Sequence, residues 1–372
     1  QFGQMGFRAE NVQVSAETNP LVLAQSPNPS PERPTVLVYG HYDVQGVDNP
    51  RSAWAMDPFA AEERDGFLIA RGASDNKGPC FAHLKAVEAI LAAGDQLPVD
   101  LVFLIEGEEE CGSRALGQFV AEGGLEPFAP LLCTVISDTS MYGQDRPSLT
   151  LGLRGIVYTE LEISGPGQDV HSGLFGGIVR NPNQLLVNAL AGLVDAEGRI
   201  AVPRFYEDIQ PLSAREKSLY AALEVDEQAY CRELGVDSLA GERAYPLLER
   251  RWTRPTLDIN FVSGGSPRTI IPARAKAAIS CRLVPGQDPE VIQAALETHI
   301  RNRLPGGNRI EFKNQHISPA YHLDLDHSLV GPTLQAIRTG FELDPVLTRE
   351  GGSIPIVIDI AAKTHAPVLL VG

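Results

Sequence analysis

Short apolar runs alternate with a helical pattern in the first part of the chain. The runs occupy residues 35–39, 99–105 and 131–137. Between the first two runs, Leu84, Val87 and Leu91 fall on one stripe, which predicts a helix from about Cys80 to Ala93. Strands that alternate with helices indicate βαβ units and therefore an α/β fold with a mostly parallel sheet.

The pattern changes after Gly155. Val157, Thr159, Leu161 and Ile163 alternate with more polar residues. This period of two predicts a half-buried antiparallel strand. A second domain is therefore expected to begin here.

Further elements are expected in this second domain. Asp288 and Pro289 suit the N-cap and the first position of a helix. The pattern also predicts a helix over 183–196, a charged helical region over 214–251 and a strand over 275–284.

Around residues 318–329 the chain is expected to return to the first domain, with a helix through Thr333 to Phe341. We therefore predict a first domain made of residues 1–154 and 319–372. Residues 155–318 are expected to form an inserted α+β domain.

Composition limits the function classes. With 47 acidic and 31 basic residues, the formal net charge is -16, which repels nucleic acid and anionic membranes, so neither is expected as a partner. The 372 residues, 43% of them apolar, can supply a core for each of two domains. Five scattered cysteines without a Cys-x-x-Cys pair fit a reducing cytoplasm. The start at Gln1 and the stop just after residues 367–371 suggest that both ends are cut.

Polar side chains follow each of the three apolar runs. His41 and Asp43 follow the first run, Glu108 to Glu110 follow the second, and Asp138 closes the third. Asp75 lies in a Gly-bounded turn, residues 72–78. Because the carboxyl ends of strands in an open α/β sheet line one crevice, these residues are expected to converge into a metal site.

The residue types suit two divalent ions about 3.5–4 Å apart. His41 can bind through one ring nitrogen, Asp75 can bridge the two ions, and Glu110 and Asp138 can each complete the coordination of one ion. Asp43 is expected to accept a hydrogen bond near the site and to tune it.

Glu109 and Glu110 are expected to divide the chemistry. In an extended segment, adjacent side chains point in opposite directions, so Glu110 can bind metal while Glu109 reaches water. Glu109 would then act as the general base that takes a proton from water and passes it to the leaving nitrogen.

Each feature alone has a simpler interpretation. The run Glu108–Glu110 is typical of a solvated charged surface, residues 75–78 of a turn, and Asp138 of a helix N-cap. His41 alone is more typical of a histidine with ordinary hydrogen-bond partners. Three such features at three strand ends favour the metal site.

Eight segments carry a more specific signal. They are residues 39–45 (YGHYDVQ), 72–78 (GASDNKG), 106–113 (EGEEECGS), 136–138 (ISD), 169–173 (DVHSG), 269–272 (TIIP), 282–285 (RLVP) and 349–353 (REGGS). As an ordered set they resemble the M20 metallopeptidases, specifically the carnosinase-like cytosolic dipeptidase branch.

The resemblance implies a metallopeptidase catalytic domain with an inserted lid that also mediates a homodimer. His41, Asp75 and Asp138 would hold one ion, and Asp75 and Glu110 the other together with a histidine near the C-terminus. Glu109 would be the base. The resemblance also implies a cis bond between Asp75 and the residue that follows it.

The resemblance also implies contacts from a neighbouring subunit. His171 of that subunit's lid would reach the active site and stabilise the developing oxyanion. Thr269 would come from the same partner.

Further residues are implied to hold the substrate. Arg282, Gly352 and Ser353 would bind its C-terminal carboxylate, and His316 matches less closely as an additional contact. Taken alone, Arg282 could be a surface ion pair and the 349–353 segment a turn.

Two features depart from the family pattern. The last implied ligand, a histidine after residues 367–371, is not among these 372 residues, and His365 precedes that run rather than following it. The two sites are therefore expected to be unequal within these residues: the ion held by Glu110 should bind weakly, unless a longer chain supplies the histidine, in which case both ions should bind. The link from Phe261 to Thr269 is also shorter than such lids usually have.

The leading hypothesis is hydrolysis of dipeptides or small peptides by water between two divalent ions. Zinc is the first expectation and manganese the alternative, because carboxylate and imidazole ligands suit both. One alternative function is an M20 deacylase or desuccinylase acting on N-acyl amino acids. Another is a metal-poor relative that serves as a binding or scaffold protein.

Overall fold

The computed structural model describes residues 1–47, 54–143, 145–307 and 309–372. They form two compact units. Unit 1 comprises Gln1–Leu151, Leu323–Thr348 and Ile354–Gly372, and unit 2 comprises Gly152–His322 and Arg349–Ser353. The domain boundaries placed after residues 154 and 318 stay a prediction. None of the helices in the described part of the chain is long and apolar enough to cross a membrane.

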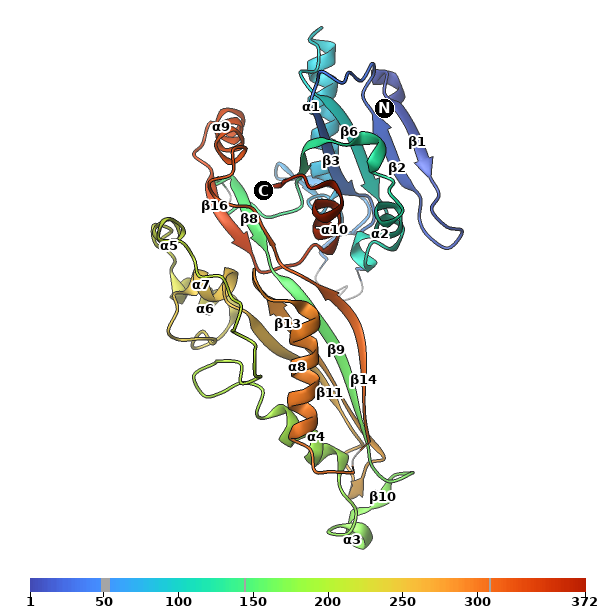
Figure 1. The fold of residues 1–372 in the computed structure, drawn as a ribbon, viewed down its shortest axis with the longest axis vertical. Coiled ribbons are helices and arrows are strands. Elements are labelled where there is room, and N and C mark those ends of the chain that lie inside the picture. The colour runs from blue at the N-terminus through green and yellow to red at the C-terminus, as the bar shows by residue number, and fades with distance from the viewer. Residues whose placement is uncertain (48–53, 144, 308) are drawn as a thin grey trace. The chain divides into compact units, whose positions relative to one another are not determined.

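Unit 1 is built on a sheet whose centre is parallel (Figure 1). The strands follow the order β1-β2-β6-β3-β7-β17-β8, and β16 also pairs with β8. Strands β6, β3, β7 and β17 run parallel to one another, while the outer pairs are antiparallel. The predicted α/β fold with a mostly parallel central sheet is confirmed. The strands span Arg8–Val12 (β1), Leu21–Gln25 (β2), Thr35–His41 (β3), Asp100–Glu106 (β6), Leu131–Ile136 (β7), Ser148–Leu153 (β8), Val346–Glu350 (β16) and Val368–Val371 (β17).

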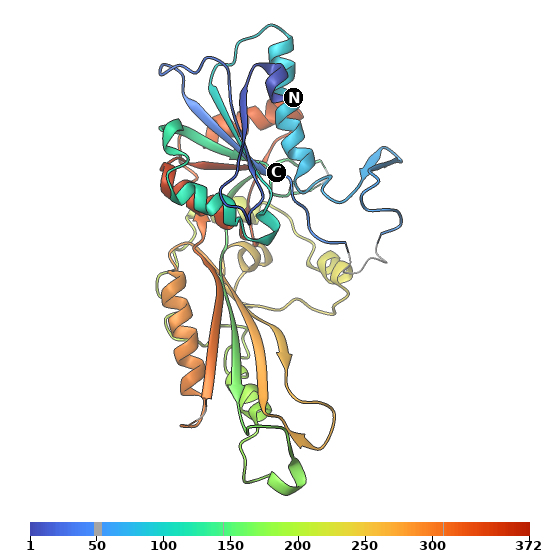
Figure 2. The ribbon, with the colours of Figure 1, turned by 90° about the vertical axis from the view of Figure 1, so that its right-hand side faces the viewer.

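The middle of this sheet is formed by the most apolar runs of the sequence. Every residue of β3 from Val36 to His41 is buried, because β6 and β7 pair with its two edges and helices cover its faces. Figure 2 shows α1 on one side of the sheet and α2 with α10 on the other. A hairpin of two short strands, Glu62–Arg64 (β4) and Phe67–Ile69 (β5), precedes α1.

The helices of unit 1 agree largely with the sequence pattern. The helix predicted from Cys80 is α1, which begins earlier, at Lys77, and ends at Ala92. The α-helices span Lys77–Ala92 (α1), Arg114–Ala121 (α2), Val330–Phe341 (α9) and Pro355–Thr364 (α10), and the 3-10 turns span Phe2–Met5 (η1), Glu109–Cys111 (η3) and Glu126–Phe128 (η4).

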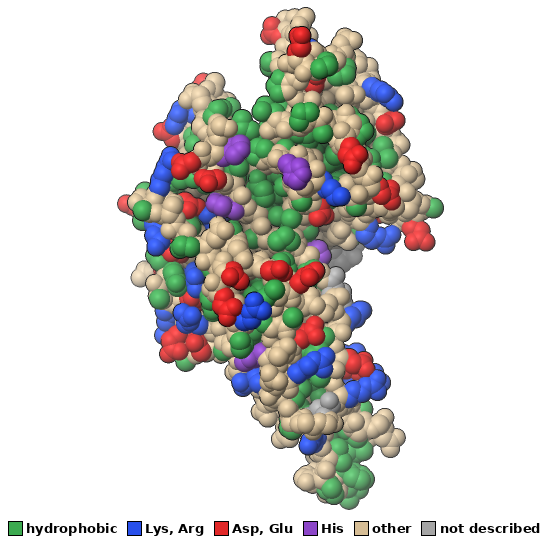
Figure 3. Space-filling model, viewed as in Figure 1, with side chains coloured by type: hydrophobic (Ala, Val, Ile, Leu, Met, Phe, Trp, Pro, Cys, Tyr) green, Lys and Arg blue, Asp and Glu red, His purple; other side chains and the backbone are tan. Residues whose placement is uncertain are grey.

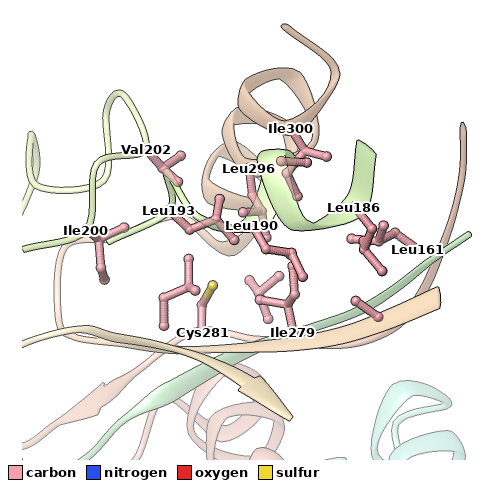
Figure 4. Packing of buried hydrophobic residues seen from close by; sticks show 14 of the residues in the cluster. Leu161, Leu186, Leu190, Leu193, Ile200, Val202, Ile279, Cys281, Leu296 and Ile300 are labelled. Carbon is pink, nitrogen blue, oxygen red and sulfur yellow. The ribbon is translucent and has the colours of Figure 1, made fainter. Parts of the chain in front are cut away.

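Unit 2 is built on an antiparallel sheet in the order β11-β13-β9-β14. The strand predicted after Gly155 is β9, and its apolar positions Val157, Leu161 and Ile163 are at most 2% exposed. These side chains form one core with residues of α4 and α8, which pack on the same face of the sheet (Figure 4). The strands span Gly155–Ser164 (β9), Val170–His171 (β10), Thr256–Ser263 (β11), Ile270–Ile271 (β12), Arg274–Leu283 (β13), Arg309–Ser318 (β14) and Tyr321–His322 (β15).

The predicted helix start at Asp288 is confirmed. The side chain of Asp288 accepts hydrogen bonds from the backbone N–H groups of Glu290 and Val291, and Pro289 occupies the first position of α8. The helices of unit 2 span Ser172–Phe175 (α3), Pro182–Leu190 (α4), Ala214–Ala221 (α5), Glu227–Leu234 (α6), Leu247–Trp252 (α7) and Pro289–Asn302 (α8).

The helix predicted to continue to residue 196 is shorter than expected, because α4 ends at Leu190. Gly192 lies two residues further on and packs against Arg303, whose Cζ would lie 2.0 Å from a Cβ at that position. This close approach comes from a distant part of the chain, so the local pattern gives no sign of it. The charged region 214–251 likewise divides into three short helices, α5 to α7.

Candidate metal centre

The strand ends of unit 1 bring three of the predicted ligands together. His41 is the last residue of β3, Asp138 follows the end of neighbouring β7, and Asp75 lies just before α1. One ligand atom from each residue lies within 4.8 Å of those from the other two. His41 is fully buried, whereas the Asp75 side chain is 63% exposed, so the cluster has one closed and one open side.

The imidazole of His41 is oriented for binding through one nitrogen. Its Nδ1 lies 3.2 Å from the backbone oxygen of Asp43 and 3.2 Å from the Asp43 carboxylate. A proton on Nδ1 donated to Asp43 leaves the lone pair on Nε2. Nε2 is buried and makes no hydrogen bond, although Oδ1 of Asp75 lies 2.9 Å away and Oδ1 of Asp138 lies 3.7 Å away.

This donor set fits a divalent cation. A neutral imidazole and two carboxylates are typical ligands of zinc and of manganese, and a bound cation would satisfy the buried Nε2. The charges around His41 also favour a cation. Burial lowers the pKa of His41, but the interaction with Asp138 and the charges of Glu109 and Asp43 outweigh burial and raise it to about 9. The surroundings of this ring thus favour positive charge.

Asp43 links the histidine to the acidic turn. Its carboxylate accepts hydrogen bonds from the backbone N–H of Glu109 at 3.3 Å and of Glu110 at 3.0 Å. The same side chain therefore contacts His41 and holds the turn that carries the proposed base.

The three consecutive glutamates have different surroundings. Glu108 is buried, and its carboxylate accepts hydrogen bonds from the backbone N–H of Asn19 at 3.0 Å and of Ala115 at 2.9 Å. This residue therefore belongs to the core. The interpretation of Glu108–Glu110 as a solvated charged run does not hold for it.

Glu109 and Glu110 do not lie in an extended segment, as the sequence analysis assumed, but in the 3-10 turn η3. The turn is closed by bonds such as that from Gly112 N–H to the Glu109 carbonyl. Burial and the charge of Asp138 raise the pKa of Glu109 to about 7, so this carboxylate interacts electrostatically with the cluster. The Glu110 carboxylate accepts hydrogen bonds from Gln45, at 3.0 Å from N–H and 2.9 Å from Nε2, and lies outside the group of three converging ligands.

Asn76 is a residue that sequence reasoning missed. It is 1% exposed, and its Nδ2 donates to the Ser137 carbonyl at 2.7 Å and to Oδ1 of Asp138 at 2.8 Å. Its Oδ1 accepts from Cys80 Sγ at 3.0 Å. The predicted cis bond between Asp75 and Asn76 is confirmed. Asn76 therefore joins the loop of one ligand to the carboxylate of another, a role that its turn-like sequence did not indicate.

Glu106, at the end of β6, was also missed. It is fully buried, and its Oε1 accepts hydrogen bonds from Tyr39 at 2.7 Å and Ser113 at 2.8 Å, while Oε2 has no partner among the described residues. Burial raises the pKa of Glu106 to about 7, although these two hydrogen bonds lower it. Asp138, by contrast, caps no helix within the described residues, where the next regular element is the strand β8.

The remaining predicted residues lie in unit 2, in two local groups and one separate position. His171, in β10, is followed by Ser172, whose N–H donates to the Thr269 carbonyl at 2.9 Å, so His171 and Thr269 are neighbours. Nδ1 of His171 accepts from Gly173 N–H at 3.0 Å.

The second group contains Arg282, Gly352 and Ser353. Nη1 of Arg282 donates to Ser353 Oγ at 3.0 Å. His316 lies on β14, where it pairs with Tyr158 of β9.

The chain is similar to proteins of known family and activity. Residues 37–363 match Peptidase family M20/M25/M40. The chain is 34% identical to the Beta-Ala-His dipeptidase of Rattus norvegicus over 95% of this chain and 74% of that protein. It is 33% identical to the Cys-Gly metallodipeptidase dug1 of Schizosaccharomyces pombe over 94% of this chain and 75% of that protein.

Solved structures are similar over nearly the whole chain. The dipeptidase Dug1p of Saccharomyces cerevisiae has a TM-score of 0.84 and 31% identity, covering 99% of this chain and 81% of that one. The M20 family metallo-carboxypeptidase Sso-CP2 of Sulfolobus solfataricus has a TM-score of 0.88 and 28% identity, covering 99% of this chain and 83% of that one.

The contacts of Asn76 generate a first prediction. Replacement of Asn76 by Ala removes the donor that orients Asp138, and loss of such a supporting hydrogen bond typically weakens metal binding ~10–100-fold. Competition between the protein and a zinc chelator measures the change. Asn11→Ala, at an exposed position of β1, is the control. Zinc affinity of Asn76→Ala within about twofold of the control would contradict the role of Asn76.

The buried carboxyl of Glu106 generates a pH prediction for the metal-free protein. Because its pKa is raised in the folded state, Glu106 stabilises the fold below its unfolded pKa, and this stability is lost as the pH rises through about 7. Glu106→Gln removes this titration. From pH 5 to 8 its free energy of unfolding should therefore rise relative to the parent, by on the order of 2 kcal/mol.

Urea unfolding of both proteins in the presence of a chelator, at pH 5 and at pH 8, measures this difference. Glu10→Gln, at an exposed position of β1, serves as the control and should show no such trend. A difference between Glu106→Gln and the parent that stays constant with pH would rule out the titration of Glu106 in this range.

Proposed function

The chain belongs to peptidase family M20/M25/M40, and on that premise we propose that it hydrolyses dipeptides with the help of two divalent metal ions. One observation supports this more than any other. The buried Nε2 of His41 has no hydrogen bond and lies within reach of two carboxylates, those of Asp75 and Asp138. A peptide bond is a poor electrophile, and divalent ions at such a cluster would polarise its carbonyl and activate water.

The proposed ligands follow from these contacts and from the family resemblance. His41, Asp75 and Asp138 would hold one ion, and Asp75 with Glu110 would contribute to the second. We propose zinc, with manganese as the alternative, because this donor set suits both. Asp43 would keep the proton of His41 on Nδ1 and fix the turn that carries Glu109 and Glu110.

Glu109 is the proposed general base. It is adjacent to the proposed ligand Glu110, and the charge of Asp138 acts on its carboxylate. Glu109 would take a proton from the attacking water, hold it on its carboxylate, and deliver it to the leaving nitrogen as the peptide bond breaks. The carboxylate is then restored for the next cycle.

Unit 2 is proposed to recognise the substrate. Arg282 and Ser353 share a hydrogen bond of 3.0 Å, and with Gly352 they would bind the terminal carboxylate of the peptide. Thr269 and His316 would add further contacts. His171, contributed by the lid of a second subunit, would stabilise the negative charge that develops on the carbonyl oxygen.

A homodimer through unit 2 is part of this proposal. Strand β11 lies at the edge of the sheet and exposes Ile259, Phe261 and Val262 by 44%, 53% and 53%. Leu174 and Ile178, in and after α3, are 70% and 79% exposed. Figure 3 shows apolar side chains gathered at the end of unit 2 that carries α3. Apolar edges and patches of this kind are typical of interaction surfaces.

The names of similar proteins and the state of the cysteines support a substrate class and a compartment. We propose dipeptides rather than N-acyl amino acids, because the similar proteins above are named as dipeptidases. The similarity to a metallo-carboxypeptidase keeps longer peptides as a second candidate. All five cysteines carry free thiols, which supports a reducing compartment such as the cytoplasm.

Replacement of Glu109 tests the mechanism. Glu109→Gln preserves size and removes the base, so peptide hydrolysis should fall at least ~10²-fold while metal content stays close to that of the parent. Initial rates on a dipeptide, with the metal content of each protein measured in parallel, test this. Glu63→Gln, on the exposed strand β4, is the control and should keep full activity.

The outcome separates the assignments. Activity of Glu109→Gln within a few fold of the parent would refute the base. A fully folded, metal-loaded parent that cleaves no dipeptide would refute the proposed function. Cleavage of tetrapeptides as fast as dipeptides would favour the carboxypeptidase instead.

The exposed edge generates a prediction on assembly. Phe261→Glu places a charge on β11 and should shift the protein from dimer to monomer, because a buried, unpaired carboxylate disfavours the interface. Sedimentation velocity over a range of concentrations measures this. Leu234→Glu changes an equally apolar residue, 62% exposed at the end of α6, and should leave the dimer intact. A parent that is monomeric throughout, or a Phe261→Glu variant as dimeric as the parent, would refute this interface.

A further inference from the structure

Arg154 lies between β8 and β9 and contacts three consecutive residues of the loop after β16. Its backbone N–H donates to the Gly352 carbonyl at 3.1 Å, and its Nε donates to the Gly351 carbonyl at 2.9 Å. Its backbone carbonyl accepts a short hydrogen bond from Ser353 Oγ. One residue thus determines the path of this loop. All of these residues belong to unit 2.

These contacts extend to Arg282. Because Ser353 gives its hydroxyl proton to the Arg154 carbonyl, its oxygen is left to accept from Nη1 of Arg282, at 3.0 Å. The side chain of Arg154 also fits closely under the loop. A Cβ at Gly351 would lie 2.7 Å from Nη2 of Arg154, so the guanidinium occupies the space beside this glycine.

The two guanidinium groups create a local excess of positive charge. Arg154 and Arg282 are half-buried, and neither forms an ion pair within 4.0 Å in the part of the chain that the structure describes. Burial and then the charge of Arg282 lower the pKa of Arg154 to about 10, while Asp258 opposes this change. Burial also lowers the pKa of Arg282, and the charge of Asp258 opposes this change as well. Two partly buried cations that repel each other are stabilised by an anion.

Arg349 provides a comparison, because its charge is paired within the protein. Arg349, also in unit 2, is buried but forms an ion pair with the buried Glu216, which the capping box at Ser213 holds in place. Its charge is therefore compensated within the protein. Arg154 instead donates to neutral carbonyl groups, those of Gly351 and Arg254, so its charge stays available to a ligand.

We propose that Arg154 is a positioning residue for the terminal carboxylate of the substrate. It holds the Gly351–Ser353 loop in the conformation that orients Arg282, and it adds a second positive charge at that point. Together these effects select peptides with a free C-terminal carboxylate over peptides with a neutral C-terminus. This inference rests on the proposed peptidase function.

The test compares a dipeptide with its C-terminal amide in the parent protein and in three variants. Arg154→Gln removes the charge and the fork of donors, whereas Arg154→Lys keeps the charge but loses the planar fork. Arg251→Gln is the matched control. Its charge acts on Arg154, but its side chain is exposed and donates to Tyr230 rather than to the loop.

We expect Arg154→Gln to raise KM for the free dipeptide ~10-fold or more, with kcat changed less than about threefold. For the amide, kcat/KM should change by less than about threefold, so selectivity falls. Arg154→Lys should lie between the parent and Arg154→Gln, and Arg251→Gln should keep the parent's selectivity. Circular dichroism and thermal melting show whether each variant is folded. If Arg154→Gln is not folded, the comparison of the two peptides is made with Arg154→Lys instead.

Several results would overturn the inference. A folded Arg154→Gln that loses activity equally on the dipeptide and the amide would show a purely structural role. An equal loss of selectivity in Arg251→Gln would show that any nearby positive charge produces the selectivity, without a specific role for Arg154. If the parent cleaves neither peptide, the proposed function fails, and calorimetric titration of both peptides then decides the inference separately. A parent that binds the free dipeptide no tighter than the amide would refute it.

Discussion

A buried imidazole nitrogen without a hydrogen bond is the constraint on which the candidate centre depends. Without a proton or a cation on Nε2, this nitrogen would face two carboxylates at a cost of about 1–3 kcal/mol, and the fold holds it in this position at the end of the buried strand β3. Asp43 keeps the opposite nitrogen engaged, so a rotation that would relieve Nε2 would break contacts on the other side of the ring. A cation bound by Nε2, Asp75 and Asp138 would remove this cost.

The acidic residues around this ring require their own compensation. Glu106 and Glu108 are buried, and both are held by neutral donors: two hydroxyl groups for Glu106 and two backbone N–H groups for Glu108. Asp43 is likewise held by backbone N–H groups. Hydrogen bonds to neutral dipoles stabilise carboxylates without neutralising them. Above about pH 7, where Glu106 is ionised as well, the centre keeps the negative charge that a divalent cation requires.

The sequence was informative where local patterns determine structure. Alternation in β9, the Asp288–Pro289 helix start and the apolar run of β3 were all visible, because burial and capping act over a few residues. The ends of β3 and β7 then located His41 and Asp138, and the Gly-bounded turn before α1 located Asp75. Partnerships across long sequence separations were not visible. Asn19 reaches Glu108 from 89 residues away and Arg154 reaches Gly351 from 197, so neither contact leaves a mark in the local sequence.

The η3 turn shows how a prediction of two different roles can rest on a wrong conformation. Glu109 and Glu110 were assigned different tasks because adjacent residues of an extended strand diverge, yet they lie in a 3-10 turn whose two N–H groups bind Asp43. The side chains still have different surroundings, Glu110 bonded to Gln45 and Glu109 near Asp138. What separates them is therefore the anchoring of the turn by Asp43, rather than strand geometry. Asp43 thus contacts the imidazole of His41 and also holds the turn that carries Glu109 and Glu110. A chain with a net charge of -16 also holds two unpaired arginines beside the Gly351–Ser353 loop. Unit 1 therefore favours a cation and unit 2 an anion, and each preference follows from the charged groups that the unit's own residues bring together.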